Sequence, residues 1–249
     1  MKIRIGFFRA FTLFELLVVI AVLGILAMMI TCPSGSKARA QRINCTNNLK
    51  QMGGAYRLVQ GDIHPAGSIY VGDPPEYGRP APNEVELRAN PPDAGYVYQY
   101  FGVMSNELNT PKLIVCPADE RTAHSNFNML KDNQSPGAYL NNTTVSYFVG
   151  RDVQEPLPHM FLYGDRNMGD SSTATRYGYS PAPTVATGNY VALGTNNSSM
   201  HWTTKTHNRQ GNVLFADGHV EGMSSAKARE ALKVTGDTTA PTPNMLLFP

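Results

Sequence analysis

The chain has 249 residues and a formal net charge of +2 at neutral pH. Three of its 21 basic residues lie in the first ten positions, and one of its 19 acidic residues lies in the apolar stretch that follows, which leaves eighteen of each. This balance argues against nucleic acid as a main ligand, because phosphate binding needs clustered positive charge. The roughly 220 residues after the apolar stretch are enough for one hydrophobic core.

Residues 11–30 form an apolar run after the short basic leader MKIRIGFFRA. Twenty helical residues at about 1.5 Å each span a bilayer core of roughly 30 Å, so the run predicts a transmembrane helix. Its one carboxylate, Glu15, would cost at least roughly 2.5–3.5 kcal/mol at membrane depth, which indicates a functional position with a partner. The alternatives are a signal anchor in which Glu15 has no role, or a cleaved signal peptide, whose apolar core is shorter.

This N-terminus resembles that of type IV prepilins and type II secretion pseudopilins. The family pattern is a basic leader, a small residue before the cut, and F-T-L-x-E-L. The matching residues are Phe11, Thr12, Leu13, Glu15 and Leu16. The resemblance implies that a prepilin peptidase cleaves between Ala10 and Phe11 and methylates the new amine of Phe11. Residues 1–10 are then the leader. Ala10 departs from the usual Gly but is also small, and slower cleavage would follow from it.

The same resemblance implies a role for Glu15 in assembly. Glu15 of one subunit would meet the amine of Phe11 in its neighbour, and each charge would offset the burial cost of the other. The implied partners are other pilin or pseudopilin subunits, an assembly platform and membrane lipid. Basic residues flank the apolar run on both sides, so charge alone does not orient it. The resemblance places the leader in the cytoplasm and the rest beyond the inner membrane.

A second helical segment is expected after Pro33, which should bend the helix because it lacks an amide donor. Apolar residues then recur at spacings of four and three, forming one stripe. The stripe is Cys45, Leu49, Met52, Tyr56 and Val59. We therefore predict a long helix over 11–60, apolar in its first half and amphipathic in its second, with the second half packed on a globular head.

The head is predicted over 61–234, with a flexible tail over 235–249. Pro, Gly and Asp dominate Gly61–Pro92, which indicates loop. The short apolar segments expected to be strands are Tyr96–Phe101, Leu113–Cys116, Val145–Val149, Met160–Tyr163, Tyr190–Leu193 and Val213–Ala216. Long polar insertions separate them, such as 165–188 and 194–206. Because no helices alternate with these segments, the expected class is α+β with an antiparallel sheet, as in the type IV pilin fold.

The segment from His207 to His219 carries a second specific pattern. Asp217 and Gly218 lie between VLFA and HVEGM, which predicts a two-residue hairpin turn that places Ala216 opposite His219. Nine residues separate His207 from the Asp-Gly pair. This spacing resembles the H-X9-DG domain found at the end of many prepilin-like proteins.

Two histidines and a carboxylate in this motif, His207, Asp217 and His219, can bind a transition metal or share a proton. However, an Asp in an Asp-Gly turn usually hydrogen-bonds its own backbone. We favour a structural role, with metal binding as the alternative and catalysis third. The sequence has no recognisable nucleophile elbow or phosphate loop. We therefore expect no enzyme activity, no cofactor and no metal.

Two of the three cysteines, Cys45 and Cys116, belong to the exported part, where disulfides persist. A bridge between them would close a loop of about 70 residues and contribute roughly 4 kcal/mol in the loop-entropy model. The alternative is two buried thiols. The sequences around them, NCTNNLKQMG and VCPAD, are similar to those of the H-X9-DG group. Cys32 is expected at the membrane edge as a free thiol.

These features together favour a structural subunit that is cleaved, methylated and assembled through its N-terminal helix into a type II secretion or type IV pilus-like filament. The alternative, from another class, is a surface-displayed module that binds a glycan or a protein and uses the helix for delivery.

Overall fold

The computed structural model describes residues 11–30, 34–63, 97–127, 142–151, 153, 157–169, 189–238 and 243–249. The chain divides into two compact units, Met1–Arg39 and Ala40–Pro249, which are described separately. The first unit contains helix α1 and the start of helix α2, and the second contains the rest of α2 and the head.

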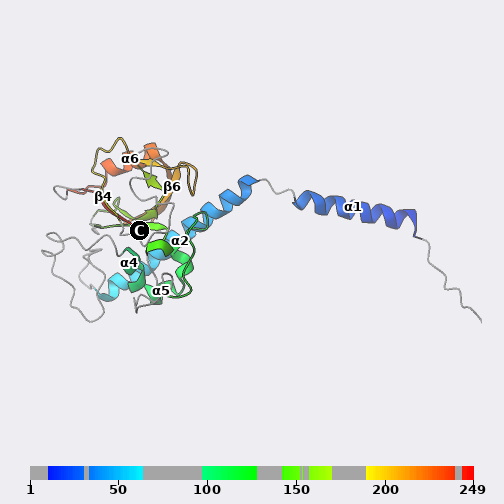
Figure 1. Cartoon of the computed structure of the whole chain (residues 1–249), viewed down its shortest axis with the longest axis horizontal. Helices are drawn as coiled ribbons and strands as arrows, with labels where there is room; N and C mark the ends of the chain where they lie inside the picture. Colours follow the sequence, from blue (N-terminus) through cyan, green and yellow to red (C-terminus); the bar gives the residue numbers. More distant parts are fainter. Residues whose placement is uncertain are drawn as a thin grey trace, which may run out of the picture. The chain divides into compact units, whose positions relative to one another are not determined.

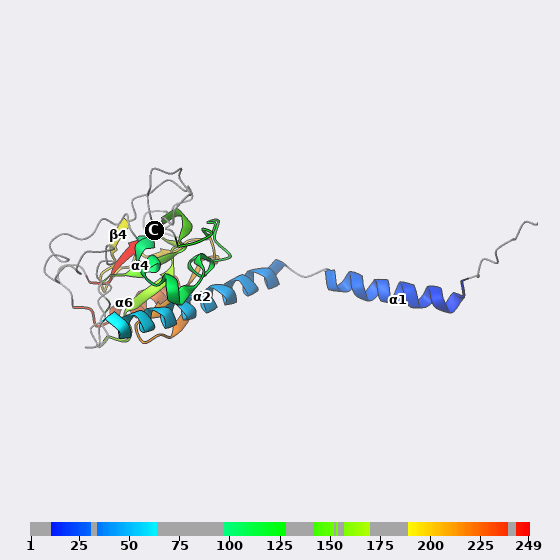
Figure 2. The same cartoon turned by 90° about the horizontal axis from the view of Figure 1, so that it is seen from below.

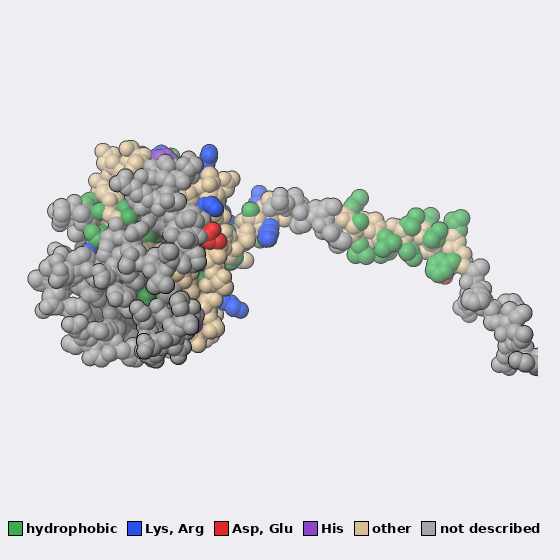
Figure 3. Space-filling model, viewed as in Figure 1, with side chains coloured by type: hydrophobic (Ala, Val, Ile, Leu, Met, Phe, Trp, Pro, Cys, Tyr) green, Lys and Arg blue, Asp and Glu red, His purple; other side chains and the backbone are tan. Residues whose placement is uncertain are grey.

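Helix α1 covers Leu13–Ile30 and begins with a capping box. The Thr12 hydroxyl accepts a hydrogen bond from the Glu15 amide (3.2 Å), and Glu15 Oε2 accepts one from the Thr12 amide (2.9 Å). This reciprocal pattern satisfies backbone donors that a helix start leaves open. Apolar side chains extend along α1 (Figure 3).

The predicted helix within 11–30 is confirmed, although it starts at Leu13. Within the described residues, no helix is both long enough and apolar enough to span a membrane, so the transmembrane assignment is not confirmed. Cys32 and the bend expected at Pro33 lie outside the described residues.

Helix α2 covers Ser34–Ile63, and its apolar stripe packs into the head. Cys45, Leu49 and Met52 have no exposed surface, and Tyr56 is buried beside them, which confirms the predicted stripe. The helix continues through Gly53, where an added Cβ would lie 3.1 Å from the Leu214 side chain. The missing side chain therefore lets the helix approach the sheet closely. Figure 2 shows α2 running along one side of the head.

The head contains a six-stranded sheet with the order β4-β8-β1-β2-β6-β7, in which every neighbouring pair is antiparallel. The strands are β1 (Tyr147–Gly150), β2 (Phe161–Asp165), β4 (Asn189–Ala192), β6 (Gln210–Phe215), β7 (Val220–Ser224) and β8 (Met245–Phe248). Two short strands, β3 (Met168–Gly169) and β5 (His201–Trp202), form a second sheet. The predicted α+β class with an antiparallel sheet is confirmed, and four of the six predicted apolar segments contribute strands.

Both faces of the large sheet are covered, because side chains alternate between two cores. Leu214 and Leu247 belong to the core that includes the stripe of α2, whereas their neighbours Phe215 and Phe248 belong to the core that includes helix α6 (Ser225–Lys233). Figure 1 shows α2 and α6 on opposite sides of the strands. A sheet buried on both faces explains the continuous apolar character of strands such as β8, whose sequence is MLLF.

Two predicted strands are wrong. Tyr96–Phe101 instead contributes to helix α4 (Val97–Val103), which precedes helix α5 (Ser105–Leu108). The most deeply buried hydrophobic side chains of this region, each at most 2% exposed, recur at spacings of four and three, the helical period. They are Val97, Phe101, Met104 and Leu108. The second predicted strand, Leu113–Cys116, begins inside the 3-10 helix η2 (Pro111–Ile114), whose first residue is a proline. A second 3-10 helix, η3, covers Asn142–Thr144.

The predicted flexible tail is also wrong at its end. Met245–Phe248 forms strand β8, which pairs with β4 on one side and β1 on the other. Before it, the buried Asp237 accepts a hydrogen bond from the Asn244 amide at 2.6 Å. The four-residue apolar segment MLLF is short, but burial on both faces of the sheet stabilises it. Of the predicted loop Gly61–Pro92, the first three residues belong to α2, and the rest lies outside the described residues.

Candidate functional site

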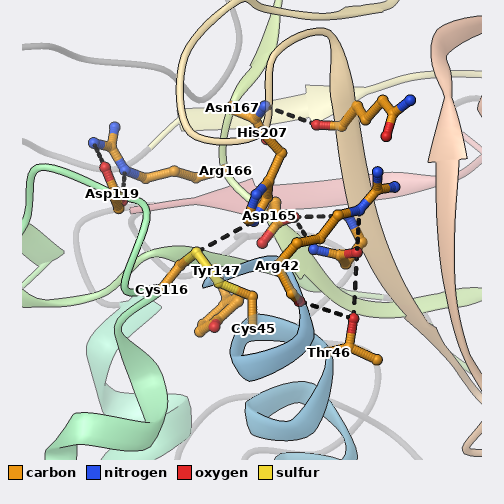
Figure 4. Close-up of polar contacts among 12 residues, drawn as sticks. Arg42, Cys45, Thr46, Cys116, Asp119, Tyr147, Asp165, Arg166, Asn167 and His207 are labelled. Atoms are coloured by element: carbon orange, nitrogen blue, oxygen red, sulfur yellow. Dashed lines mark hydrogen bonds and ion pairs between the residues drawn. A yellow bond between two sulfur atoms is a disulfide. The ribbon is translucent and has the colours of Figure 1, made fainter. Parts of the chain in front are cut away.

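Four separate segments of the head converge on one buried group of polar side chains (Figure 4). The inner residues come from α2, from the segment after η2, from the end of β2 and from the loop before β6, and we call them the Cys–Asp–His cluster. They are Cys45, Cys116, Asp165 and His207. One potential ligand atom from each residue lies within 4.8 Å of the others, and all four residues are buried.

A disulfide joins Cys45 to Cys116 across 71 positions, with a Cα–Cα distance of 5.2 Å. The bridge predicted from the sequence is therefore present. It connects α2 to the segment that follows η2, and it closes a loop for which the chain-entropy model gives roughly 4 kcal/mol. Asn48, one turn further along α2, strengthens the same connection by donating a hydrogen bond to the Val115 carbonyl at 3.2 Å.

Asp165 ends strand β2 and has no exposed surface. Its Oδ2 atom accepts hydrogen bonds from the backbone and side-chain nitrogens of Asn212, at 2.7 and 2.8 Å. Its Oδ1 atom has no hydrogen-bond partner within the described part of the chain. Burial raises the pKa of Asp165 to about 7, although the hydrogen bonds from Asn212 act in the opposite direction. An unsatisfied oxygen in such a site is costly, by about 1–3 kcal/mol.

His207 contacts two members of the cluster through one ring nitrogen. Nε2 lies 3.3 Å from Cys116 Sγ and 3.4 Å from Asp165 Oδ2. Burial, followed by the positive charge of Arg42, lowers the pKa of His207 to about 4. Between about pH 4 and 7 the two shifts leave Asp165 protonated and His207 neutral, so the contact there is a neutral polar pair despite its ion-pair distance.

The loop that carries His207 has an unusual backbone. Thr206, Asn208 and Arg209 all have positive φ, between 48° and 63°. Each such residue costs of order 1 kcal/mol unless the surroundings hold it in place. The Asn167 side chain holds this loop by donating to the carbonyls of Lys205 and Gln210, both at 3.0 Å. The fold therefore uses strained backbone to point His207 inward.

Next to the cluster lies a buried ion pair between Asp119 and Arg166. Both side chains are 1% exposed, and two hydrogen bonds of 2.7 and 2.8 Å join them in a fork. Burial acts to raise the pKa of Asp119, but the hydrogen bond and charge of Arg166 outweigh it and hold this pKa below its ordinary value. Sequence reasoning missed Asp165 and Arg166, because it assigned 165–188 to a long polar insertion between strands. The sequence feature that could have indicated them is the charged segment GDRN, which comes directly after the apolar segment FLY.

The Asp217-Gly218 hairpin is present, but its predicted register is wrong by one position. Leu214 pairs with Val220, and the Phe215 amide donates to the His219 carbonyl at 2.9 Å. The loop therefore has three residues, 216–218, and only Gly218 among them has positive φ, at 86°. This is the pattern of a type I turn followed by a left-handed glycine, which tolerates an ordinary residue before the glycine.

Asp217 serves its own turn, as expected. Its Oδ1 atom accepts from the His219 amide at 3.0 Å and contacts His219 Nδ1 at 2.5 Å. The His219 ring stacks on Phe215 with a centroid distance of 4.2 Å. Among the described residues, the one group with metal-binding potential includes His207 but neither Asp217 nor His219. The three motif residues therefore divide between the buried cluster and the exposed turn.

Comparison with known families places the N-terminus in a defined class. A family model described as "Prokaryotic N-terminal methylation motif" matches residues 8–31. This match supports a type IV pilin-like protein with a prepilin-type N-terminus. The matched segment includes Ala10, Phe11 and Glu15, of which Ala10 lies outside the described residues. No curated protein and no solved structure matches the chain. The resemblance to the H-X9-DG domain stays a prediction.

Proposed function

We propose that the chain is a pilin-like structural subunit. Prepilin peptidase would cleave it between Ala10 and Phe11 and methylate Phe11. The apolar segment 11–30 would anchor it in the inner membrane, with the leader in the cytoplasm and the head beyond the membrane. It would then assemble with other subunits, through an assembly platform, into a type II secretion or type IV pilus-like filament. The observation that carries this proposal is the methylation-motif match over residues 8–31.

The surface of α1 supports the proposal. Its large apolar side chains are 43–81% exposed from Leu13 to Met28, with no polar face. A helix that is apolar all around belongs in lipid or among other helices, because water penalises its exposed surface. An anchored subunit would place α1 in lipid, and an assembled subunit would place it among neighbouring copies. The proposed role is structural, without enzyme activity, and the burial of the polar cluster of the head supports this part of the proposal.

Glu15 would have two tasks that can be separated. Its Oε2 atom accepts hydrogen bonds from the amide and the hydroxyl of Thr12, so it caps its own helix. Its charge would also neutralise the methylated amine of Phe11 in a neighbouring subunit. A glutamine can take the capping position but has no charge. Glu15→Gln therefore tests the charge, and Glu15→Leu removes both functions.

The first test is the mature N-terminus. Intact-mass measurement and N-terminal sequencing of membrane-extracted protein should give a chain that starts at Phe11 and carries one added methyl group. Ala10→Gly, which restores the residue usual in the family, should be processed at least as completely. A mature chain that starts beyond residue 30 would refute the proposal.

The second test measures assembly. Both Glu15→Leu and Glu15→Gln should be processed and membrane-bound at wild-type levels, yet be lost from the sheared filament fraction. Normal filaments from Glu15→Gln alone would show that capping is what assembly needs. Normal filaments from both variants would rule out any role for Glu15 in assembly.

A further inference from the structure

The Cys–Asp–His cluster contains the donor types that bind transition metals. It offers two sulfurs, one imidazole nitrogen and one carboxylate oxygen, all buried and mutually within 4.8 Å. We propose that these four side chains bind one Zn²⁺ ion when Cys45 and Cys116 are thiols. The disulfide and the metal would then be alternative states of the same site.

The spacing of the donor atoms fits tetrahedral zinc. Bonds of about 2.0–2.3 Å to nitrogen, oxygen and sulfur give tetrahedral edges of about 3.3–3.8 Å. Nε2 of His207 already lies 3.3 Å from Cys116 Sγ and 3.4 Å from Asp165 Oδ2. Two edges of the site therefore have the required length, and the main change that binding needs is the separation of the two sulfurs as thiolates. Figure 4 shows the His207 ring and the disulfide directed toward each other.

The surroundings of the cluster also suit a cation. The Oδ1 atom of Asp165 is buried and has no hydrogen-bond partner among the described residues, so a metal bound to this carboxylate would compensate its burial. The ligand oxygen itself, Oδ2, accepts two hydrogen bonds from Asn212, and carboxylates that bind metals are commonly held by such hydrogen bonds. Two thiolates and one carboxylate exceed the charge of Zn²⁺ by one, and Arg42 lies close enough to act electrostatically on Asp165 and His207.

The chemistry balances without an added reductant, because a newly made chain contains thiols. Binding removes one proton from each of Cys45 and Cys116, and one from Asp165 wherever this side chain is protonated, and it forms two zinc–thiolate bonds and one zinc–carboxylate bond. Later oxidation by an oxidant of the disulfide class transfers two electrons from these sulfurs to the oxidant. The Cys45–Cys116 bond then forms and Zn²⁺ leaves. In both states the site ties α2 to the segment after η2, so the head keeps this connection before and after oxidation.

The test uses the full-length protein in mild detergent, under anaerobic conditions, with Cys32→Ser as background so that the only thiols belong to the cluster. After reduction with a phosphine, Co²⁺ should bind with one ion per chain. The expected signal is a thiolate-to-cobalt charge-transfer band together with the intense visible bands of tetrahedral cobalt. Zn²⁺ should abolish these bands and raise the melting temperature of the reduced protein. The disulfide form should show no bands, and EDTA should not change its melting temperature.

Single variants identify the ligands. His207→Asn and Asp165→Asn should each weaken binding by at least about tenfold. His219→Asn is the matched control, since this histidine belongs to the same motif but lies in the exposed turn, and it should bind as the background protein does. Disulfide formation on reoxidation checks that each variant still folds. The proposal fails if the reduced background protein binds no cobalt, if both ligand variants bind as tightly as the control, or if the disulfide form binds equally well.

Discussion

Breaking the buried ion pair between Asp119 and Arg166 should be among the most destabilising polar changes in the head. Both side chains are 1% exposed, so Asp119→Asn leaves a guanidinium without its counter-charge in a dry site. Removing one partner of such a pair costs about 3–5 kcal/mol. Glu120, whose Oε1 lies 3.5 Å from Arg166 Nη2 and is partly exposed, offers some replacement charge. We therefore expect about 3 kcal/mol, or a melting temperature lower by about 6–12 °C for a chain of this size.

The assay is urea unfolding of the purified full-length protein in detergent, for Asp119→Asn, Arg166→Met and the double variant. The double variant should cost clearly less than the two single variants together, because it removes both charges. Glu230→Gln, which breaks an exposed pair with Lys233, is the control and should cost at most about 1 kcal/mol. The prediction is refuted if the double variant loses as much unfolding free energy as the two single variants together. It is also refuted if Asp119→Asn loses no more unfolding free energy than Glu230→Gln does.

The pH dependence gives a second check on the same pair. The folded-state pKa of Asp119 lies below its ordinary value of 3.8, so the unfolded chain takes up the proton first as pH falls. The stabilisation by this carboxylate is therefore fully present above pH 3.8 and is lost below it. Asp119→Asn has no such titration. The difference in unfolding free energy between wild type and variant should narrow as the pH falls below about 3.8, and a constant difference would contradict the assignment.

Two further predictions concern the neighbouring sites. The pKa of Asp165 is raised from 3.8 to about 7, so its contribution to the stability of the wild type should fall by about 4 kcal/mol as the pH rises through that window. Over the same range, urea unfolding should show the free energy of unfolding of Asp165→Asn rising relative to that of the wild type. Parallel curves of unfolding free energy from about pH 4 to 8 would contradict this prediction. Gly218→Val forces a branched side chain into φ 86° and should cost about 1–3 kcal/mol by thermal melting. The control Gly54→Ala, in an open helical position, should be neutral or stabilising, and equal melting temperatures for Gly218→Val and wild type would rule out the strained turn.

Sequence patterns identified the elements that bury one clear face or have one clear turn signal. The stripe of α2 was visible because Cys45, Leu49 and Met52 repeat at the helical period and all become fully buried. Four strands were visible as short apolar segments between turn residues. Strand β8 was not, because the Pro-rich text before it indicated a tail, and only its pairing with β4 and β1 makes its four residues a strand. Segments this short depend on tertiary contacts that local pattern does not contain.

The candidate site was predictable only in part, for a similar reason. Cys45, Cys116 and His207 were recognised as unusual residues, but no local pattern joins them to Asp165 or Arg166. Asp165 is the last residue of strand β2 and Arg166 follows it, and two charged residues at the end of an apolar segment look the same in sequence as the start of an exposed loop. The segment GDRN is buried because three other segments of the fold pack around it. This packing brings Asp119 within hydrogen-bonding distance of Arg166, and Asn212 within hydrogen-bonding distance of Asp165.

The nine-residue spacing of the motif has a structural explanation. Strand β6, Gln210–Phe215, fills most of the interval between His207 and Asp217, and six residues at about 3.3 Å each make an arm of roughly 20 Å. One end of this arm delivers His207 to the buried cluster, and the other ends in the turn that Gly218 permits. Because successive side chains alternate between the two cores, a change of one residue would exchange Leu214 and Phe215 between faces. The spacing is therefore set by the length of one hairpin strand. The buried cluster fixes the strand at one end and the Asp217-Gly218 turn fixes it at the other, so the histidine and the aspartate of the motif do not need to contact each other.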